Sequence, residues 1–391
     1  MAATAAGVPA PRPSLPADEL TLARVLNRLT FGARPRDVET VRHTGLEAYL
    51  DDQLHPERIP DVALEARLAG LPTLGLKARV VAEQYVMPLE QARRERRAAA
   101  GQTGADSPVE DDEVVKAAQK KANQPVMELT QAKVLRAVYS ERQLQEVLVD
   151  FWFNHFNVDV RKGADRIYVS EYEREAIRPH VLGRFRDLLG ATAKSPAMLF
   201  YLDNWMSADP AGPHAPPAAA RPRRGFRFSD SPKATSPGAP PRNNPRGLNE
   251  NYARELMELH TLGVDGGYSQ ADVQEVARCF TGWTIERPQQ GGAFAFDARL
   301  HDPGEKRVLG HRIRAGGGQT DGEQVLDLLA THPATARFIA TKLVRRFVAD
   351  VPPTALVDRA AKTFRETKGD LREVMRTIVL SPEFLSRDER F

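Results

Sequence analysis

The stretch that most constrains the fold is NENYARELMELHTLG, Asn249–Gly263. On a helix that advances about 100° per residue, most of its apolar side chains and His260 fall on one arc, which consists of Tyr252, Ala253, Leu256, Met257, Leu259 and His260, while Leu262 falls outside it. The opposite arc carries the polar residues Asn251, Arg254, Glu255 and Glu258. Amphipathic helices of this kind bury the apolar arc against other helices. The pattern therefore predicts a helix inside a mainly α protein, with His260 on the side that faces the core.

The polar arc leaves two interpretations open. Glu255 and Glu258 are three residues apart and can converge on one point, as can Asn251 with Glu255. These side chains, with Arg254, can form a catalytic set, or they can be salt-bridged parts of a structural helix. Buried carboxylates without partners are costly. We therefore expect Arg254 to be buried and paired with a carboxylate.

The bulk composition excludes several classes of protein. The 391 residues include 55 Lys and Arg against 52 Asp and Glu, so nothing in the charge balance demands a nucleic-acid partner. The single cysteine, Cys279 in VARCF, excludes an intramolecular disulfide and predicts a buried, inert thiol. No stretch approaches the ~18 apolar residues that a membrane span needs. Glycine-rich nucleotide motifs, HExxH and GxSxG do not occur in the sequence.

Helical periodicity along most of the chain predicts one large multi-helix domain over residues 17–391. The clearest apolar stripe consists of Leu144, Val147, Leu148, Phe151 and Trp152. Alternating apolar residues from Phe294 onward, with Asp302-Pro303-Gly304 as a turn, predict one small β-hairpin over residues 293–313. Ser269 with Asp272 predicts a helix N-cap.

Three regions interrupt the helical pattern. Residues 1–16 are rich in Ala and Pro and predict a disordered tail. Residues 92–125 carry blocks of like charge and predict a solvated, charged excursion with helical ends. Residues 207–247 contain ten prolines and a net charge of +5, and they predict a disordered, basic, Pro-rich insert.

Three histidines lie in apolar surroundings on different segments: His155 in DFWFNHFNV, His260, and His301, which precedes Asp302. Neutral imidazoles and a carboxylate are ligands for zinc, iron, copper or manganese. One hypothesis is thus a metal-dependent hydrolase or oxidoreductase in which His155, His260, and His301 or Asp302 share one pocket around a divalent metal ion. The alternative is a non-catalytic scaffold or assembly partner, whose polar residues form a buried network that fixes helix registry.

The chain resembles the large bacterial family of domain of unknown function 1800. The resemblance runs from about Leu22 to Phe384 and rests on segments such as FWFNHF, HDPGEKRVLG and LNENYARELMELHTLGVDGGYSQADVQEVARCFTGW. It implies a predominantly helical fold and leaves the substrate unknown. It also implies a sulfatase-like neighbour-gene product as a partner. Many members are exported, whereas the N-terminus as given has no signal peptide and by default predicts a cytoplasmic protein.

Deleting residues 210–244 is expected to leave the fold intact, because the composition of this insert supplies no core. A cooperative thermal transition of the shortened protein, followed by circular dichroism, checks the expectation. Loss of that transition would show that the insert carries part of the core.

Overall fold

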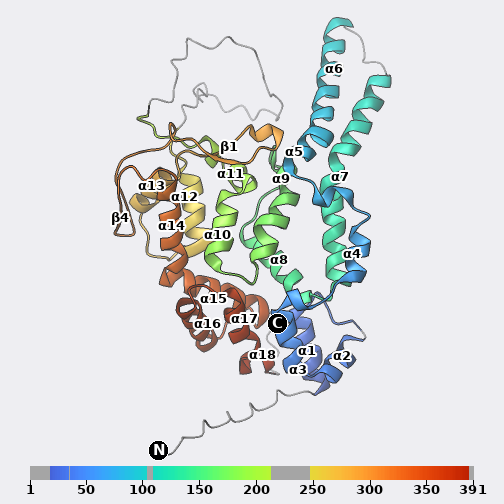
Figure 1. Cartoon of the computed structure of the whole chain (residues 1–391), viewed down its shortest axis with the longest axis vertical. Coiled ribbons are helices and arrows are strands. Elements are labelled where there is room, and N and C mark those ends of the chain that lie inside the picture. The colour runs from blue at the N-terminus through green and yellow to red at the C-terminus, as the bar shows by residue number, and fades with distance from the viewer. Residues whose placement is uncertain (1–17, 35, 104–108, 213–246, 387–391) are drawn as a thin grey trace, which may run out of the picture.

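The computed structural model describes residues 18–34, 36–103, 109–212 and 247–386. In these residues the fold is predominantly helical, with two small antiparallel sheets of two strands each (Figure 1). The predicted fold class is therefore confirmed. The predicted disordered tail, residues 1–16, lies outside the described residues. None of the helices in the described part is long and apolar enough to cross a membrane.

The first half of the chain supplies the helices α1 (Glu19–Leu29), α2 (Asp37–Thr44), α3 (Leu46–Leu54), α4 (Val62–Leu68), α5 (Ala78–Val81), α6 (Met87–Thr103), α7 (Val109–Tyr139), α8 (Gln143–His155), α9 (Asp165–Glu171), α10 (Phe185–Lys194) and α11 (Pro196–Tyr201). Two π-helical segments join this set, η3 (Ala82–Val86) and η4 (Tyr172–Ile177).

The second half supplies α12 (Glu250–Met257), the π-helical η7 (Glu258–Leu262), α13 (Gln270–Cys279), β1 (Trp283–Ile285), β2 (Phe294–Phe296), β3 (Lys306–Val308), β4 (His311–Ile313), α14 (Gln319–Thr331), α15 (Pro333–Phe347), α16 (Thr354–Glu366), α17 (Leu371–Val379) and α18 (Pro382–Leu385). The predicted cap of α13 is confirmed, because Ser269 and Asp272 form a reciprocal capping box.

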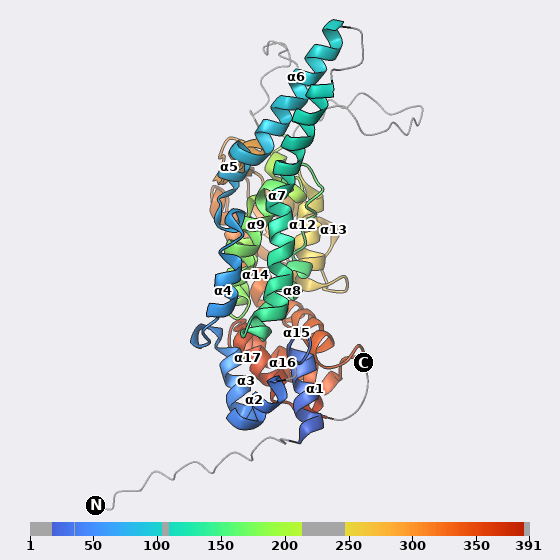
Figure 2. The same ribbon diagram turned by 90° about the vertical axis from the view of Figure 1, so that its right-hand side faces the viewer.

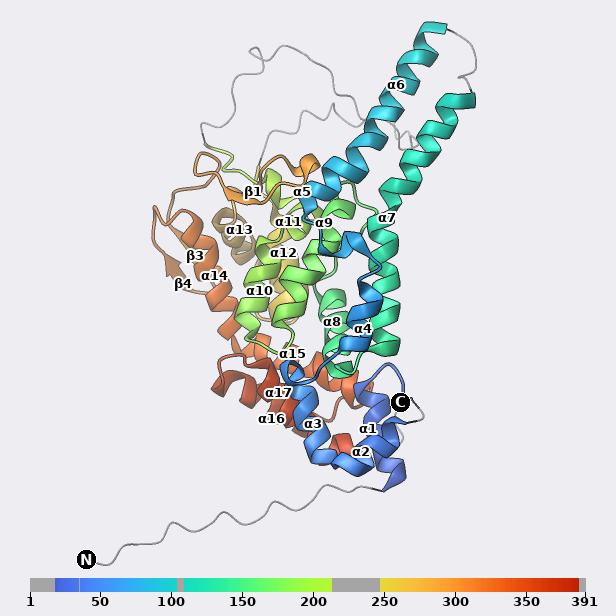
Figure 3. The same cartoon turned by 45° about the vertical axis from the view of Figure 1, so that its right-hand side comes forward.

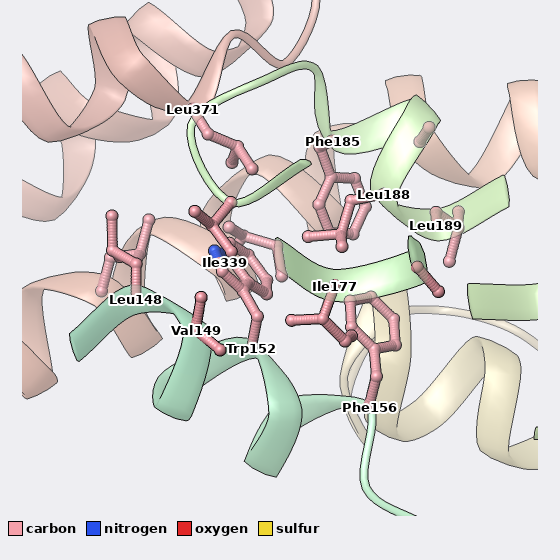
Figure 4. Close-up of a cluster of buried hydrophobic side chains, with 14 of the residues drawn as sticks. Leu148, Val149, Trp152, Phe156, Ile177, Phe185, Leu188, Leu189, Ile339 and Leu371 are labelled. Atoms are coloured by element: carbon pink, nitrogen blue, oxygen red, sulfur yellow. The ribbon is translucent and has the colours of Figure 1, made fainter. Parts of the chain in front are cut away.

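The core gathers segments from both halves of the chain (Figure 4). Trp152 of α8 is fully buried, with its ring 5.9 Å from that of Phe185 on α10. Ile339 of α15 and Leu371 of α17 close the same cluster. Helices predicted only by their own periodicity are thus joined through one apolar interior.

A helical arm projects from this body, as Figures 1, 2 and 3 show. We define it as α6 together with residues 109–127 of α7, the two helices that pack against each other there. Arg93 of α6 donates to Gln119 of α7 at 2.7 Å. Most of the predicted charged excursion, residues 92–125, is therefore helical. Its charged side chains within residues 93–97 and 113–121 lie exposed on the surface of the helical pair and do not interrupt it.

The single hairpin predicted over residues 293–313 is wrong. Strand β2 pairs with the earlier strand β1, and β3 pairs with β4. The tight turn lies at Leu309 and Gly310, which both have positive φ, 49° and 80°. Two successive residues of that kind make the turn type that fits the twist of a hairpin. Leu309 is an unusual residue there, and this explains why the sequence pointed to Asp302–Gly304 instead.

The predicted Pro-rich insert is shorter than residues 207–247. Its first residues are built into the body, since the Ala208 amide donates to the Gly247 carbonyl at 3.1 Å and the Asp209 amide to that of Leu300 at 2.8 Å. Residues 213–246 lie outside the described part of the chain.

A buried ion-pair network ties α8 to η4. Arg178 binds both carboxylate oxygens of Glu146, at 2.7 and 3.0 Å, and also donates to Glu173 at 3.1 Å. Lys133 and Arg136 of α7 lie 3.3 and 3.9 Å from these two carboxylates. Both glutamates are buried, so the network supplies the positive charge that they need.

Replacing Arg178 with Met is expected to lower the free energy of unfolding by about 3–5 kcal/mol, because it leaves two buried carboxylates short of positive charge. Urea denaturation measures the change. Arg337→Met is the matched control, since Arg337 pairs with Asp358 at the exposed surface. Equal losses in the two variants would show that the buried network contributes no more than a surface pair.

Candidate functional site

The first cluster of candidate residues joins His155 at the end of α8, His260 in η7 and Lys342 on α15. The Nε2 atom of His155 lies 3.0 Å from the backbone carbonyl oxygen of His260, and its Nδ1 lies 2.9 Å from Lys342 Nζ. A carbonyl oxygen only accepts, so Nε2 carries the proton and Nδ1 accepts from the lysine. Both ring nitrogens of His155 are therefore committed inside the protein.

Burial sets the protonation of this cluster. It lowers the pKa of His155 well below its ordinary value, and the charge of Lys342 lowers it further. The same two causes lower the pKa of His260 to about 3. Burial, and then Arg345, lower the pKa of Lys342. At neutral pH the cluster thus consists of two uncharged imidazoles beside one half-buried lysine.

The second cluster surrounds a buried ion pair between Lys306 on β3 and Asp321 on α14. Lys306 Nζ lies 2.6 Å from Asp321 Oδ2, and both side chains are fully buried. His301 Nε2 lies 3.2 Å from the same oxygen, while its Nδ1 donates to the Thr281 carbonyl at 2.8 Å. A Cβ on Gly317 would come within 2.0 Å of Asp321 Oδ1, so a larger residue at this point would force the buried carboxylate to move.

Asp302 belongs to the edge of this second cluster. Arg278 binds it in a fork, with Nε 2.6 Å from one oxygen and Nη2 3.2 Å from the other. Burial alone would raise the pKa of Asp302, but the hydrogen bonds from Arg278 hold it below its ordinary value. The carboxylate of Asp302 is therefore paired with Arg278, a partner that the sequence pattern did not predict.

The two clusters have no residue in common, and none of the hydrogen bonds described above joins one to the other, so a single pocket stays a prediction. The backbone beside His301 contacts the loop that carries Ser207, Ala208 and Asp209, and Ser207 accepts from the amide of Asn249 at the start of α12. His260 lies about ten residues further along α12 and η7. At about 1.5 Å per residue, that is about 15 Å. The contacts of His301 therefore lie toward the start of α12, whereas His260 lies beyond its end, in η7.

The proposed catalytic set on α12 lies at the surface of the helix rather than in a pocket. Arg254 is half-buried, and its guanidinium donates to Gln270 at 2.7 Å. No carboxylate of the described residues forms an ion pair with it, so the expected buried pair of Arg254 is wrong. The reason is that the first turn of α13 offers an amide oxygen at that point, and water reaches the rest of the side chain.

The two glutamates of α12 and η7 do influence each other. Burial raises the pKa of Glu255, and the neighbouring charge of Glu258 raises it further. Glu258 accepts a hydrogen bond from the Tyr268 hydroxyl at 2.9 Å. Asn251, on the same polar arc, is exposed. Glu255 and Glu258 are thus close enough for their charges to interact, although both side chains are only half-buried. The catalytic roles of these residues remain predictions.

A shared metal site does not fit these contacts. Among the described residues, no group of three or more His, Cys, Asp or Glu side chains is placed to hold a metal ion. A metal at His155 Nδ1 would have to displace Lys342, and one at Asp302 would compete with Arg278. Metal binding stays a prediction, which metal analysis of the purified protein with and without a chelator tests.

A third feature is the buried carboxyl group of Asp165, the first residue of α9. The residue has no exposed surface, and neither carboxyl oxygen has a hydrogen-bond partner in the described structure. Burial raises its pKa to about 8 against the opposing charge of Lys162, and Asp203 and Asp159 add to the rise. The group is therefore mostly protonated below pH 8.

Sequence reasoning missed Lys342, Asp321 and Asp165. Lys342 carried a usable signal, because it interrupts the apolar run between Ile339 and Leu343 on a predicted helix. Asp321 and Asp165 carried none, since an acidic residue near a helix start is ordinarily a solvated cap. The buried thiol was predicted correctly: burial raises the pKa of Cys279 to about 12.

Comparisons with known proteins agree with the resemblance seen in the sequence. A family model described as "Protein of unknown function (DUF1800)" matches residues 24–391, nearly the whole chain. Neither the curated proteins nor the solved structures contain a match.

Asp165 should make stability depend on pH in one direction. Its pKa rises from an unfolded value near 3.9 to about 8, so the folded state binds this proton more tightly. The free energy of unfolding should therefore fall as pH rises from about 4 to about 8, by up to about 1.4 kcal/mol per pH unit, and then level off. Asp165→Asn should remove that part of the slope.

Chemical denaturation at each pH measures the slope, as the difference between variant and wild type. Asp327→Asn is the control, because Asp327 is exposed. An unchanged slope in Asp165→Asn would mean that the folded protein does not bind this proton more tightly.

Proposed function

We propose that this chain, which belongs to the DUF1800 family of proteins of unknown function, is a non-catalytic assembly protein that binds a partner through its helical arm. The observation that carries the proposal is the arm itself. It extends beyond the body in all three views, although pairing two helices against the body would bury more surface (Figures 1, 2 and 3).

The surface of the arm supports a binding role. Val114 and Met127 on α7 are 58% and 65% exposed. Single exposed apolar residues are ordinary, but Met, together with Arg, is enriched at protein interfaces. The Arg-rich helix α6 lies beside them. The arm therefore combines the two side-chain types that interfaces favour.

The two polar clusters support a structural role for the body. His155 with Lys342 joins α8 to α15, and Lys306 with Asp321 joins β3 to α14. Each bond connects segments from different parts of the chain, and each is buried or half-buried. Such networks fix the register of packed elements. In the metal-dependent alternative, His155 would first have to leave Lys342, and Asp302 would have to leave Arg278.

The partner to test first is the sulfatase-like neighbour-gene product that the resemblance implies. Removing residues 95–117 and joining Arg94 to Ala118 through a short glycine linker would shorten the arm just beyond the Arg93–Gln119 contact. The tagged wild type is expected to retain this partner through purification from its own cells, and the shortened protein to lose it. Mass spectrometry of the purified complexes measures both.

The body of the shortened protein should melt as the wild type does, because none of the described residues that are removed belongs to the apolar core. Arg337→Gln, on the exposed face of α15, serves as the surface control. A shortened protein that melts normally and keeps every partner of the wild type would show that the arm is not the binding element.

A further inference from the structure

A cleft of about 1140 Å³ lies where the arm meets the body. We call it the arm-base cleft. Its walls come from η3 and α6 on one side, from α7 on another, and from the loop before α9 and the first turn of α9 on a third. Pockets of roughly 300–1,000 Å³ hold drug-sized ligands, so this cleft is large enough for several residues of an extended peptide.

The charges that line the arm-base cleft are predominantly positive. Four arginines, Arg93, Arg94, Arg161 and Arg166, face two glutamates, Glu83 and Glu90, so the lining carries a net charge of +2. Glu83 is also bound from outside by Arg79 at 2.9 Å, and Arg161 by Asp159 at 2.8 Å. The positive charge of Arg79 and the negative charge of Asp159 offset each other, so the excess of positive charge in the cleft remains.

Arg166 lines the cleft and has only neutral hydrogen-bond partners among the described residues. Its guanidinium donates to the side chain of Asn123 at 2.7 Å and to the carbonyl of Ala122 at 3.4 Å, both neutral groups. Its Nε atom is buried without a hydrogen-bond partner, and no described carboxylate forms an ion pair with it. A half-buried guanidinium without an anion is costly, and a bound carboxylate would remove that cost.

A chain of hydrogen bonds along α7 holds this arginine in place. Arg93 donates to Gln119, Gln119 donates to Asn123 at 3.0 Å, and Asn123 accepts from Arg166. The chain links an arginine of the arm to one of the body through three consecutive contacts. Both guanidinium groups are therefore positioned before any ligand arrives, which lowers the entropic cost of binding.

We propose that the arm-base cleft binds an acidic, partly apolar peptide segment of a partner protein, with Arg166 as the central carboxylate-binding residue. This inference rests on the proposed assembly function and names the chemistry of the partner. The lining also includes Val86, Leu89, Met127 and Ile167, which offer apolar contact that a bare phosphate ion would not use. A nucleic acid would need more positive charge and aromatic side chains for base stacking, and the lining has no aromatic residue among those described.

The test uses the full-length protein and a fluorescein-labelled octapeptide of alternating Glu and Leu. Fluorescence anisotropy is expected to show saturable binding that weakens with salt, and no saturable binding of the matching Lys and Leu peptide. Arg166→Gln should weaken the acidic peptide about tenfold or more, because a hydrogen bond to a charged group is lost while the contact with Asn123 can remain.

Met127→Glu is the second variant, and its exposed position separates lost binding from lost folding. It should also weaken the acidic peptide, through repulsion and loss of apolar contact. Arg337→Gln should leave binding unchanged. Equal weakening in Arg166→Gln and Arg337→Gln, or no saturable binding by the wild type, overturns the proposal. So does displacement of the peptide by inorganic phosphate at the same concentration, which would indicate a simple anion site.

The proposal that the arm-base cleft binds a peptide and the proposal that the arm binds a partner can fail independently. If Arg166→Gln keeps a cellular partner that the shortened arm loses, the arm binds the partner elsewhere, and only the cleft proposal fails. If neither variant loses a partner, the assembly function fails as well.

Discussion

The burial of Trp152 is the constraint on which the rest of the structure depends. Its ring contacts Phe156 of the same chain segment and Phe185 of α10, and Ile339 of α15 lies in the same cluster. Once α8 is fixed against α15 in this way, His155 at the end of α8 must meet Lys342, three residues beyond Ile339. The lowered pKa values of this cluster then follow from burial in that interior. A polar contact that resembles a catalytic pair is thus a consequence of how the core closes.

Much of the architecture could be predicted from periodicity, because the hydrophobic effect acts on each helix separately. The apolar stripe of α8 and most of the buried arc of α12 are observed, and His260 is buried as its angular position predicts. Leu259 is the exception: it lies in the π-helical η7, where the turn is wider than 100° per residue implies, and it is 47% exposed. The strands could not be predicted equally well, since β1 pairs with β2 across eight intervening residues and each strand has only three residues. Short strands carry little pattern, and their register is set by tertiary contacts such as the fully buried Trp283.

The candidate site shows a different limit of sequence reasoning. Which residues are buried was largely predictable, whereas their partners were not. Arg278 and Asp302 are 24 residues apart, and Lys342 and His155 are 187 apart, so no local pattern could pair them. For the same reason, similar residue types on different segments do not imply one pocket. The contacts of His301 lie toward the start of α12 and His260 lies beyond its end, and position along the helix axis is a property that a wheel projection discards.

The charged side chains of the body and those at the base of the arm differ in the partners that the protein provides for them. In the body, Glu146 and Glu173 share Arg178, and Asp321 has Lys306, so each of these buried charges has an opposite charge beside it. At the arm base, Arg166 has only neutral hydrogen-bond partners, although Glu90 lies in the lining of the same cleft. Gln119 and Asn123 of α7, rather than carboxylates, hold the arginines there. Arg254 and Lys342 also have neutral partners, but neither of them lines the arm-base cleft. A half-buried arginine that lines a cleft can receive a negative charge from outside, and this position distinguishes Arg166 from the charges of the internal clusters.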